Sequence, residues 1–263
     1  MFRTILFPCY QGQKLTANLS SPQILSNYLN LKYRVDLELS PNLFQNLKNL
    51  YQINKHILVP KINIGGDHSM SIATVAHSIQ TYPRVKVIWF DAHPDINTYQ
   101  SSTSKNYHGM PLAFLTGLDY EEKFNFLEQK LPFVDLLYVG IRDIDSYESE
   151  IIKSKKIKYI TCSELNQKPL ETLHKIKQFI SDLPCHISFD VDSLDPGIID
   201  STGTPVPEGL QLGPCRVVLD GLHREHIVNM DITELNLKLG ESEKSLKNLK
   251  YLFQKYLQYP SFL

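Results

Sequence analysis

The sequence lacks features that mark several classes of protein. It has only four cysteines in 263 residues and no CxxC pair; the cysteines are Cys9, Cys162, Cys185 and Cys215. This spacing argues against a disulfide-stapled fold and indicates reduced, packed thiols in a cytoplasmic protein. No apolar stretch approaches the roughly 20 residues that cross a bilayer, so we expect no membrane span. The first residues do not show the pattern of a secretory leader either.

An excess of one charge sign is also lacking. The 27 basic residues nearly balance the 28 acidic ones, and the formal net charge is -1. No overall field therefore attracts nucleic acid or an anionic membrane, and we expect a small-molecule partner. The sequence also lacks a linker, an internal repeat and a low-complexity tract. With 42% apolar residues, it predicts one domain over residues 1–263.

Short β-rich runs alternate with helix-like segments along the whole sequence. Several runs are almost continuously apolar, as strands covered on both faces must be. The expected strands are residues 4–7, 33–37, 57–64, 85–90, 136–139, 157–160, 186–189 and 227–232. A helix start is expected at Ser21-Pro22, and further helices at residues 41–56, 68–82, 111–118, 146–155, 169–183, 214–223 and 242–259.

This alternation predicts an α/β fold, namely a three-layer αβα sandwich with a mainly parallel sheet of about eight strands. An eight-stranded closed barrel is the alternative that the same pattern leaves open. In both layouts, ligands bind at the carboxyl ends of the parallel strands. We therefore expect the functional side chains at those ends.

Acidic and imidazole side chains follow four of the apolar runs. The segments are Gly-Gly-Asp-His-Ser at 65–69, Asp-Ala-His-Pro-Asp at 91–95, Asp-Val-Asp at 190–192 and Asp-Ile-Thr-Glu at 231–234. Because alternate residues of a strand share one face, Asp91, His93 and Asp95 are expected to converge. Crowded, buried carboxylates need cations, since an unpaired buried charge is costly. Each segment alone fits an ordinary polar loop, but together they predict a polynuclear metal site.

The same segments resemble the signature segments of the arginase family of ureohydrolases. The resemblance rests on residues 65–69, 91–97, 108–109, 188–196 and 231–234, and extends over residues 57–260. It implies two Mn²⁺ ions, which zinc or nickel can replace in vitro. The implied ligands of one ion are His68, Asp91, Asp95 and Asp190, and those of the other are Asp91, His93, Asp190 and Asp192.

The resemblance also implies hydrolysis of a guanidino substrate. Two ions lower the pKa of a water molecule, and the resulting hydroxide attacks the guanidinium carbon. Glu234 is expected to pair with the guanidinium, while Asp95 and His108 pass a proton to the departing amine. Without the resemblance, Glu234 fits a helix-entry carboxylate and His108 fits a solvated loop residue.

Three further segments favour arginase, which converts L-arginine to L-ornithine and urea. Asn97 and Ser104 lie in a loop rich in hydroxyls and amides that can bind an α-carboxylate. Asp145 is expected to anchor the α-ammonium, with Glu148 helping through water. Thr204 is expected beside the carboxylate that binds the guanidinium. The alternative for Asp145 is a cap of the following helix.

Two other functions stay open. One is agmatinase or another guanidino or formimidoyl hydrolase of the same family. The other, from a different class, is a catalytically inactive, metal-binding regulatory paralogue. The region before residue 57 is short and lacks an expected glycine-rich loop, and the chain stops soon after its final helix. Because the family uses such peripheral parts in assembly, a homo-oligomer is left open.

Overall fold

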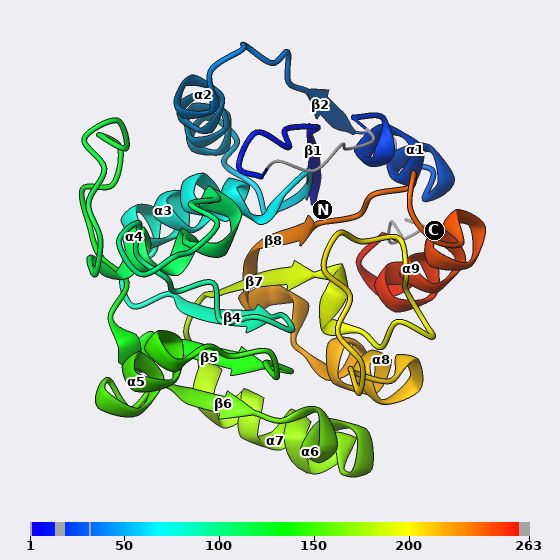
Figure 1. Cartoon of the computed structure of the whole chain (residues 1–263). Helices are drawn as coiled ribbons and strands as arrows, with labels where there is room; N and C mark the ends of the chain where they lie inside the picture. Colours follow the sequence, from blue (N-terminus) through cyan, green and yellow to red (C-terminus); the bar gives the residue numbers. More distant parts are fainter. Residues whose placement is uncertain (1, 14–18, 32, 258–263) are drawn as a thin grey trace.

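All eight expected strands are present in the computed structural model, which describes residues 2–13, 19–31 and 33–257 (Figure 1). Every strand pair is parallel, and the order in the sheet is β2-β1-β3-β8-β7-β4-β5-β6. The strands are β1 (Arg3–Phe7), β2 (Arg34–Asp36), β3 (Lys61–Gly65), β4 (Lys86–Phe90), β5 (Leu136–Val139), β6 (Lys158–Ile160), β7 (Cys185–Asp190) and β8 (Ile227–Thr233). Because β2 and β6 are open edges, the closed barrel is excluded.

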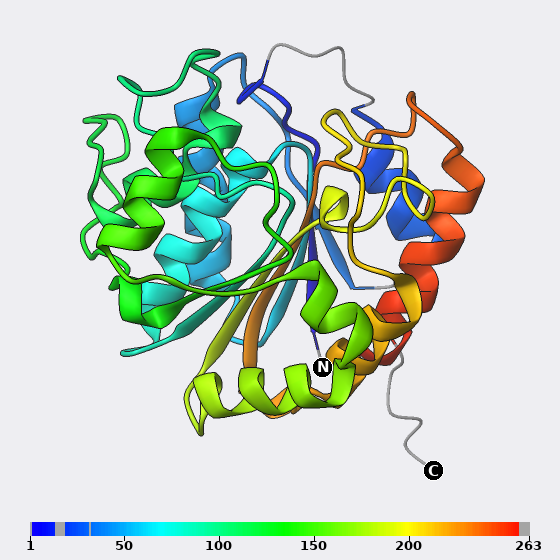
Figure 2. The ribbon, with the colours of Figure 1, turned by 60° about the horizontal axis from the view of Figure 1, so that its bottom comes forward.

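Helices cover both faces of the sheet, so the predicted three-layer αβα sandwich is confirmed (Figure 2). One layer contains α2 (Leu43–His56), α3 (Ser71–Thr81), α4 (Pro111–Thr116) and α5 (Ser146–Ser154). The other contains α1 (Ser21–Tyr28), α6 (Cys162–Gln167), α7 (Pro169–Ile180), α8 (Leu212–Gly221) and α9 (Ser242–Leu257). Among the described residues, none of these helices is long and apolar enough to cross a membrane.

Strand alternation divides the hydrophobic core into two parts. On β4, Val87 and Trp89 pack with the layer of α2 to α5, while Ile88 and Phe90 pack with the layer of α1 and α6 to α9. All four side chains are fully buried. This two-sided burial explains why the strands read as continuous apolar runs in the sequence.

Two differences from the sequence expectation have a local cause. The strand predicted from residue 57 begins at Lys61, because α2 continues to His56 and Pro60 cannot donate to a strand ladder. The short helix α6 was not predicted; a capping box between Thr161 and Glu164 starts it. The last two residues of the helix predicted at 242–259 lie outside the described residues.

The four motif-bearing strands are the four central strands of the sheet. β3 and β4 are consecutive motif strands in the chain, yet β8 and β7 lie between them. The carboxyl ends of these strands therefore meet at one edge, where parallel α/β sheets bind their ligands. Segments that are more than 160 residues apart, such as 65–69 and 231–234, become neighbours there.

Candidate metal centre and active site

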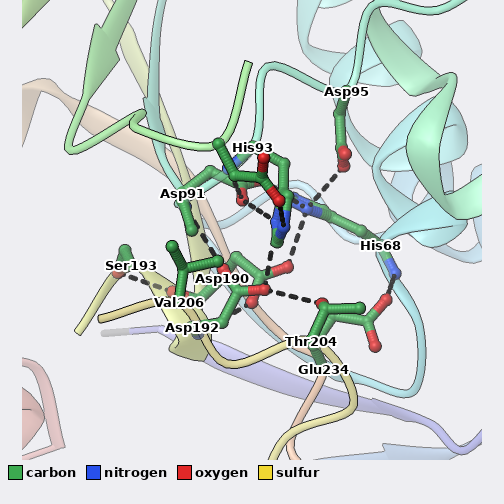
Figure 3. Close-up of polar contacts among 12 residues, drawn as sticks. His68, Asp91, His93, Asp95, Asp190, Asp192, Ser193, Thr204, Val206 and Glu234 are labelled. Carbon is green, nitrogen blue, oxygen red and sulfur yellow. Dashed lines mark hydrogen bonds and ion pairs between the residues drawn. The ribbon is translucent and has the colours of Figure 1, made fainter. Parts of the chain in front are cut away.

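His68 follows β3 and lies among three carboxylates (Figure 3). Its Nδ1 is 3.0 Å from Asp91 Oδ2, 3.1 Å from Asp95 Oδ2 and 3.0 Å from Asp190 Oδ2. The side chain is 1% exposed, and Nδ1 makes no hydrogen bond. A buried ring nitrogen that faces three carboxylate oxygens without a hydrogen bond is suited to share a cation with them.

A second group of ligand atoms lies beside the first and shares Asp91 with it. His93 Nδ1 is 3.4 Å from Asp91 Oδ1 and 3.2 Å from Asp192 Oδ2. Asp91 is held in place by the His93 backbone N–H, 2.8 Å from Oδ1, and by the Trp89 indole N–H, 2.9 Å from Oδ2. Its two oxygens thus face the two groups separately.

Asp190 and Asp192 come from the end of β7 and the turn that follows. The Asp192 backbone N–H donates to Asp190 Oδ1 at 2.9 Å, which leaves Asp190 Oδ2 facing His68. Asp192 Oδ1 accepts from the Ala92 backbone N–H at 3.2 Å, while its Oδ2 faces His93. In each carboxylate, one oxygen is fixed by the backbone and the other is directed into the centre.

The charges of this centre do not balance among the protein groups alone. Burial and the nearby Asp192 and Asp91 carboxylates raise the pKa of Asp190 well above its usual value. Burial and Asp91 raise the pKa of Asp95 to about 7. Burial by itself lowers the pKa of His93, but hydrogen bonds to Asp192 and Asp91 outweigh it and raise the pKa to about 12. The pKa values of Asp190 and Asp95 thus reflect crowding of buried carboxylates, which positive charge close by relieves.

The donor set fits divalent cations. Four aspartates supply four negative charges, which two divalent ions would match, and the two imidazoles add neutral nitrogen donors. A site rich in oxygen, with two imidazoles and no thiolate, suits manganese better than structural zinc. His68 Nδ1, which is buried, has no hydrogen bond and faces three carboxylates, fits the position of a metal ligand.

Asp91, His93 and Asp95 do converge, but not by the strand alternation that the sequence analysis expected. β4 ends at Phe90, and residues 91–95 form a loop. Asp95 takes a left-handed backbone conformation, with φ of 49°, and turns its side chain back to His68. This conformation costs a residue other than glycine about 1–3 kcal/mol, a strain that is concentrated at functional sites.

Glu234 follows β8 and has a left-handed backbone too, with φ of 63°. Its Oε1 accepts from the His68 backbone N–H at 2.8 Å and lies 3.0 Å from His108 Nδ1. Burial by itself lowers the pKa of His108, but the hydrogen bond and charge of Glu234 raise it to about 9. His108 is therefore a paired group next to the metal centre and not the solvated loop residue of the alternative reading.

The centre forms one wall of a cavity of about 440 Å³. The four residues expected to bind the amino-acid end of the substrate line this cavity, and so does Thr204, which was expected beside the guanidinium-binding carboxylate; the four are Asn97, Ser104, Asp145 and Glu148. His93, Asp95, His108, Asp190, Asp192 and Glu234 line it as well. The structure thus brings the predicted substrate residues to the predicted metal residues, while their roles stay predictions.

Asp145 also caps a helix, as its alternative reading proposed. Its Oδ1 accepts from the Glu148 backbone N–H at 2.9 Å, in a capping box at the start of α5. Its Oδ2 accepts from Asn97 Nδ2 at 2.7 Å. Thr204 donates to Asp192 Oδ2 at 3.0 Å. The capping bond occupies one Asp145 oxygen and orients the other toward Asn97.

Two residues at the site were not assigned a role from the sequence. Gln13 Nε2 donates to Glu234 Oε2 at 2.8 Å, from a loop at the carboxyl end of β1. The Arg142 guanidinium donates to backbone carbonyls of the turn after β7, Asp192 among them at 2.9 Å, and to the Val206 carbonyl at 2.6 Å. For Gln13, the only available signal was its position after a strand at the same sheet edge. Arg142 lies in a motif already assigned to substrate binding, but nothing local indicated its carbonyl partners.

Comparison with known proteins agrees with this geometry. The model of the arginase family matches residues 15–256. An arginase from Entamoeba histolytica is 38% identical over 201 residues, which are 73% of this chain and 68% of that protein. An arginase from Plasmodium berghei is 36% identical over 240 residues, 87% of this chain and 66% of its own length. The chain thus spans about two thirds of the length of these relatives.

The fold matches at nearly full length. A crystal structure of the Entamoeba histolytica arginase in complex with L-ornithine superposes with a TM-score of 0.88 and 30% sequence identity. The superposition covers 98% of this chain and 99% of that one. The family resemblance and the predicted fold are therefore confirmed: this chain belongs to the arginase family of metal-dependent hydrolases, and these relatives are arginases, which act on a guanidino C–N bond.

Proposed function

We propose that this protein is an arginase, which hydrolyses L-arginine to L-ornithine and urea with two Mn²⁺ ions. The observation that carries the proposal is the meeting of two ligand groups, joined through Asp91, with Glu234 and His108 in one cavity. The match to arginases over most of the chain supports the same reaction. L-ornithine, the compound bound in the Entamoeba histolytica structure, is the product expected from L-arginine.

The proposed ligands of the two ions are those expected from the sequence. His68, Asp91, Asp95 and Asp190 would hold one ion, and Asp91, His93, Asp190 and Asp192 the other. When bound, the ions would supply hydroxide at neutral pH by lowering the pKa of water. Asp190 contacts His68 and so belongs to the first ligand group. Its proposed bridging role requires the same carboxylate to bind the second ion as well.

Glu234 is the proposed partner of the guanidinium. Although burial by itself raises the pKa of Glu234, the hydrogen bond and charge of His108 hold it below its usual value, so the group is ionised. Its oxygens are fixed by His68, His108 and Gln13, which leaves the carboxylate with little freedom to rotate. A fixed buried anion selects a planar cation with N–H donors, which is the reacting end of arginine.

His108 is the proposed proton donor for the departing amine. The leaving ornithine nitrogen needs a proton, and an imidazole with a raised pKa carries one at neutral pH. Asp95, also in the cavity wall, has a raised pKa and can hold a proton on the way. The Glu234 contact keeps the His108 ring oriented until the product departs.

The amino-acid end of arginine is proposed to lie at the mouth of the cavity. There Asn97 and Ser104 would donate to the α-carboxylate without adding a charge that repels the guanidinium. Asp145, with Glu148 through water, would pair with the α-ammonium. Thr204 would contact the substrate beside Glu234. This polar mouth favours arginine over agmatine, which lacks the α-carboxylate.

Free cysteines support the proposed location. All four cysteines are free and buried, as expected of thiols in a reducing compartment. We therefore place the enzyme in the cytoplasm. Cell fractionation with an antibody to the protein tests this placement, and recovery in an oxidising compartment would contradict it.

The test of the function is product release by purified, Mn²⁺-loaded protein, measured as urea from L-arginine and agmatine and as formamide from N-formimidoyl-L-glutamate. The proposal expects arginine to be the preferred substrate and Asp190→Ala to abolish release. Faster turnover of agmatine or of the formimidoyl compound would make the protein a different ureohydrolase. Tight Mn²⁺ binding without turnover of any guanidino compound would instead indicate the regulatory paralogue.

A further inference from the structure

A chain of buried polar groups runs from His68 to Asp231, on the side of the imidazole away from the carboxylates. His68 Nε2 is 2.8 Å from Ser188 Oγ, and Ser188 Oγ is 3.0 Å from Ser71 Oγ. Ser71 Oγ then donates to Asp231 Oδ2 at 2.9 Å. Ser71, Ser188 and Asp231 are each 0% exposed, so solvent does not compete for these bonds.

The last member of the chain fixes the direction of every hydrogen bond in it. Although burial by itself raises the pKa of Asp231, the nearby His186 and its hydrogen bond hold the pKa below its usual value. An ionised carboxylate only accepts, so Ser71 directs its one hydroxyl proton to Asp231. Ser71 Oγ must then accept from Ser188, and Ser188 Oγ must accept from His68.

We propose that Asp231 is a positioning residue for the metal centre: through Ser71 and Ser188 it keeps the proton of His68 on Nε2 and so reserves Nδ1 for a cation. Nδ1 is the buried atom without a hydrogen bond that faces the three carboxylates. The metal part of this inference rests on the proposed function, whereas the placement of the Nε2 proton does not.

Neighbouring side chains hold both ends of this hydrogen-bonded series, His68 and Asp231, in place. The His68 ring stacks on Trp89, with centroids 4.2 Å apart and an interplanar angle of 13°, and this contact opposes a rotation that would move both ring nitrogens away from their partners. Asp231 Oδ1 accepts from Asn63 at 2.8 Å, and Oδ2 also accepts from Thr74 at 2.5 Å. Because several donors fix this carboxylate, it stays oriented toward Ser71. Metal-bound histidines generally depend on such a partner at the second nitrogen.

Two hydroxyls on α3 donate to the same Asp231 oxygen, but only one belongs to the chain. Ser71→Ala removes the link, whereas Thr74→Val removes the other hydroxyl and keeps the volume of the side chain. Both variants cost Asp231 one hydrogen bond, and only Ser71→Ala also removes the bond to Ser188. Ser71→Thr, which restores a hydroxyl, serves as the rescue.

The experiment measures Mn²⁺ affinity by titration calorimetry, and exchange of the His68 Nε2 proton by ¹H–¹⁵N NMR of the metal-free protein. Ser71→Ala should weaken Mn²⁺ binding about 10- to 100-fold and speed the exchange. Thr74→Val should match the wild type in both measurements. Should Ser71→Ala destabilise the fold, Ser188→Ala breaks the same chain and takes its place.

Two results would overturn the inference: unchanged Mn²⁺ affinity in Ser71→Ala, or an equal loss in Ser71→Ala and Thr74→Val. The second would mean that Asp231 supports the core without directing the proton. A wild-type protein that does not bind Mn²⁺ contradicts the proposed function instead. In that case the Nε2 proton exchange of the same variants still decides whether the chain orients His68.

Discussion

Arg142 connects the end of β5 to the turn after β7 and to the loop that carries Thr204. Its guanidinium donates to five backbone carbonyls within 3.2 Å, those of Gly140, Asp192, Ser193, Val206 and Pro207. Among the described residues, no carboxylate forms an ion pair with it. Replacing Arg142 by methionine keeps the apolar stem and removes all five bonds.

The size of the effect follows from what the carbonyls lose. Val206 and Pro207 are only partly buried or exposed, so water can replace the lost donors there. The Ser193 and Gly140 carbonyls each keep a second donor, from Leu210 N and Cys162 Sγ. The buried Asp192 carbonyl is left without a replacement, at a cost of about 1–3 kcal/mol. With smaller losses at the other carbonyls, we expect Arg142→Met to lower the free energy of unfolding by about 3 kcal/mol.

Urea unfolding of the metal-free protein measures this loss without the contribution of bound ions. Arg142→Lys should lose less, because an ammonium has three donors but not the planar fork. The matched control is Arg216→Met on α8, where an arginine pairs with Asp220 near the surface, so that its loss should change the stability much less. Since Arg142 holds Asp192 and the Thr204 loop, Arg142→Met should also raise KM for arginine. Equal stability of the two methionine variants, or an unchanged KM, would refute the reasoning.

Three further predictions concern the site and the core. Asp190→Ala should lose Mn²⁺ and activity together. His108→Ala should retain both ions, as measured by metal analysis, but should turn over arginine about 10- to 10⁴-fold more slowly. Loss of metal from His108→Ala would contradict these roles. Asp145→Asn should raise KM for arginine and leave unchanged the turnover of 5-guanidinopentanoate, a guanidino compound without the α-amino group. Equal losses on both substrates would make the residue purely a helix cap. Burial lowers the pKa of Lys61 to about 8 from 10.5, so the unfolded state binds more protons between these values and stability rises with pH there. Lys61→Met should therefore raise the free energy of unfolding, measured in urea, at about pH 7, and the difference from the wild type should shrink by about pH 10. A difference that does not change with pH would show that the lysine charge does not cause it.

The strands and their ends could be read from the sequence because the information is local. A strand buried on both faces must be apolar throughout, and the first charged residues after it must lie near its end. Val87, Trp89 and Phe90, followed by Asp91, illustrate both rules. The boundary of β3 was less certain, because an apolar run after α2 gives no sign of where pairing begins.

Side-chain geometry at the site was less accessible. Asp95 reaches His68 through a left-handed backbone, a conformation that no sequence rule assigns to an aspartate before an isoleucine. Gln13 contacts Glu234 across 221 positions of chain, and this pairing exists only because β1 and β8 lie on either side of β3. The double use of Asp145, as a helix cap and as a partner of Asn97, also needs two elements placed in space.

The sequence by itself determined the class of fold, the ligand types and the sheet edge at which they lie, since each depends on neighbouring residues. The tertiary structure alone decided the strand order that puts β8 and β7 between β3 and β4. It also decided which oxygen of each aspartate faces which imidazole. The link from Asp231 to the Nε2 side of His68 is likewise a tertiary feature. The physical reason is that strand order and hydrogen-bond direction arise from packing between distant segments, which no local pattern records.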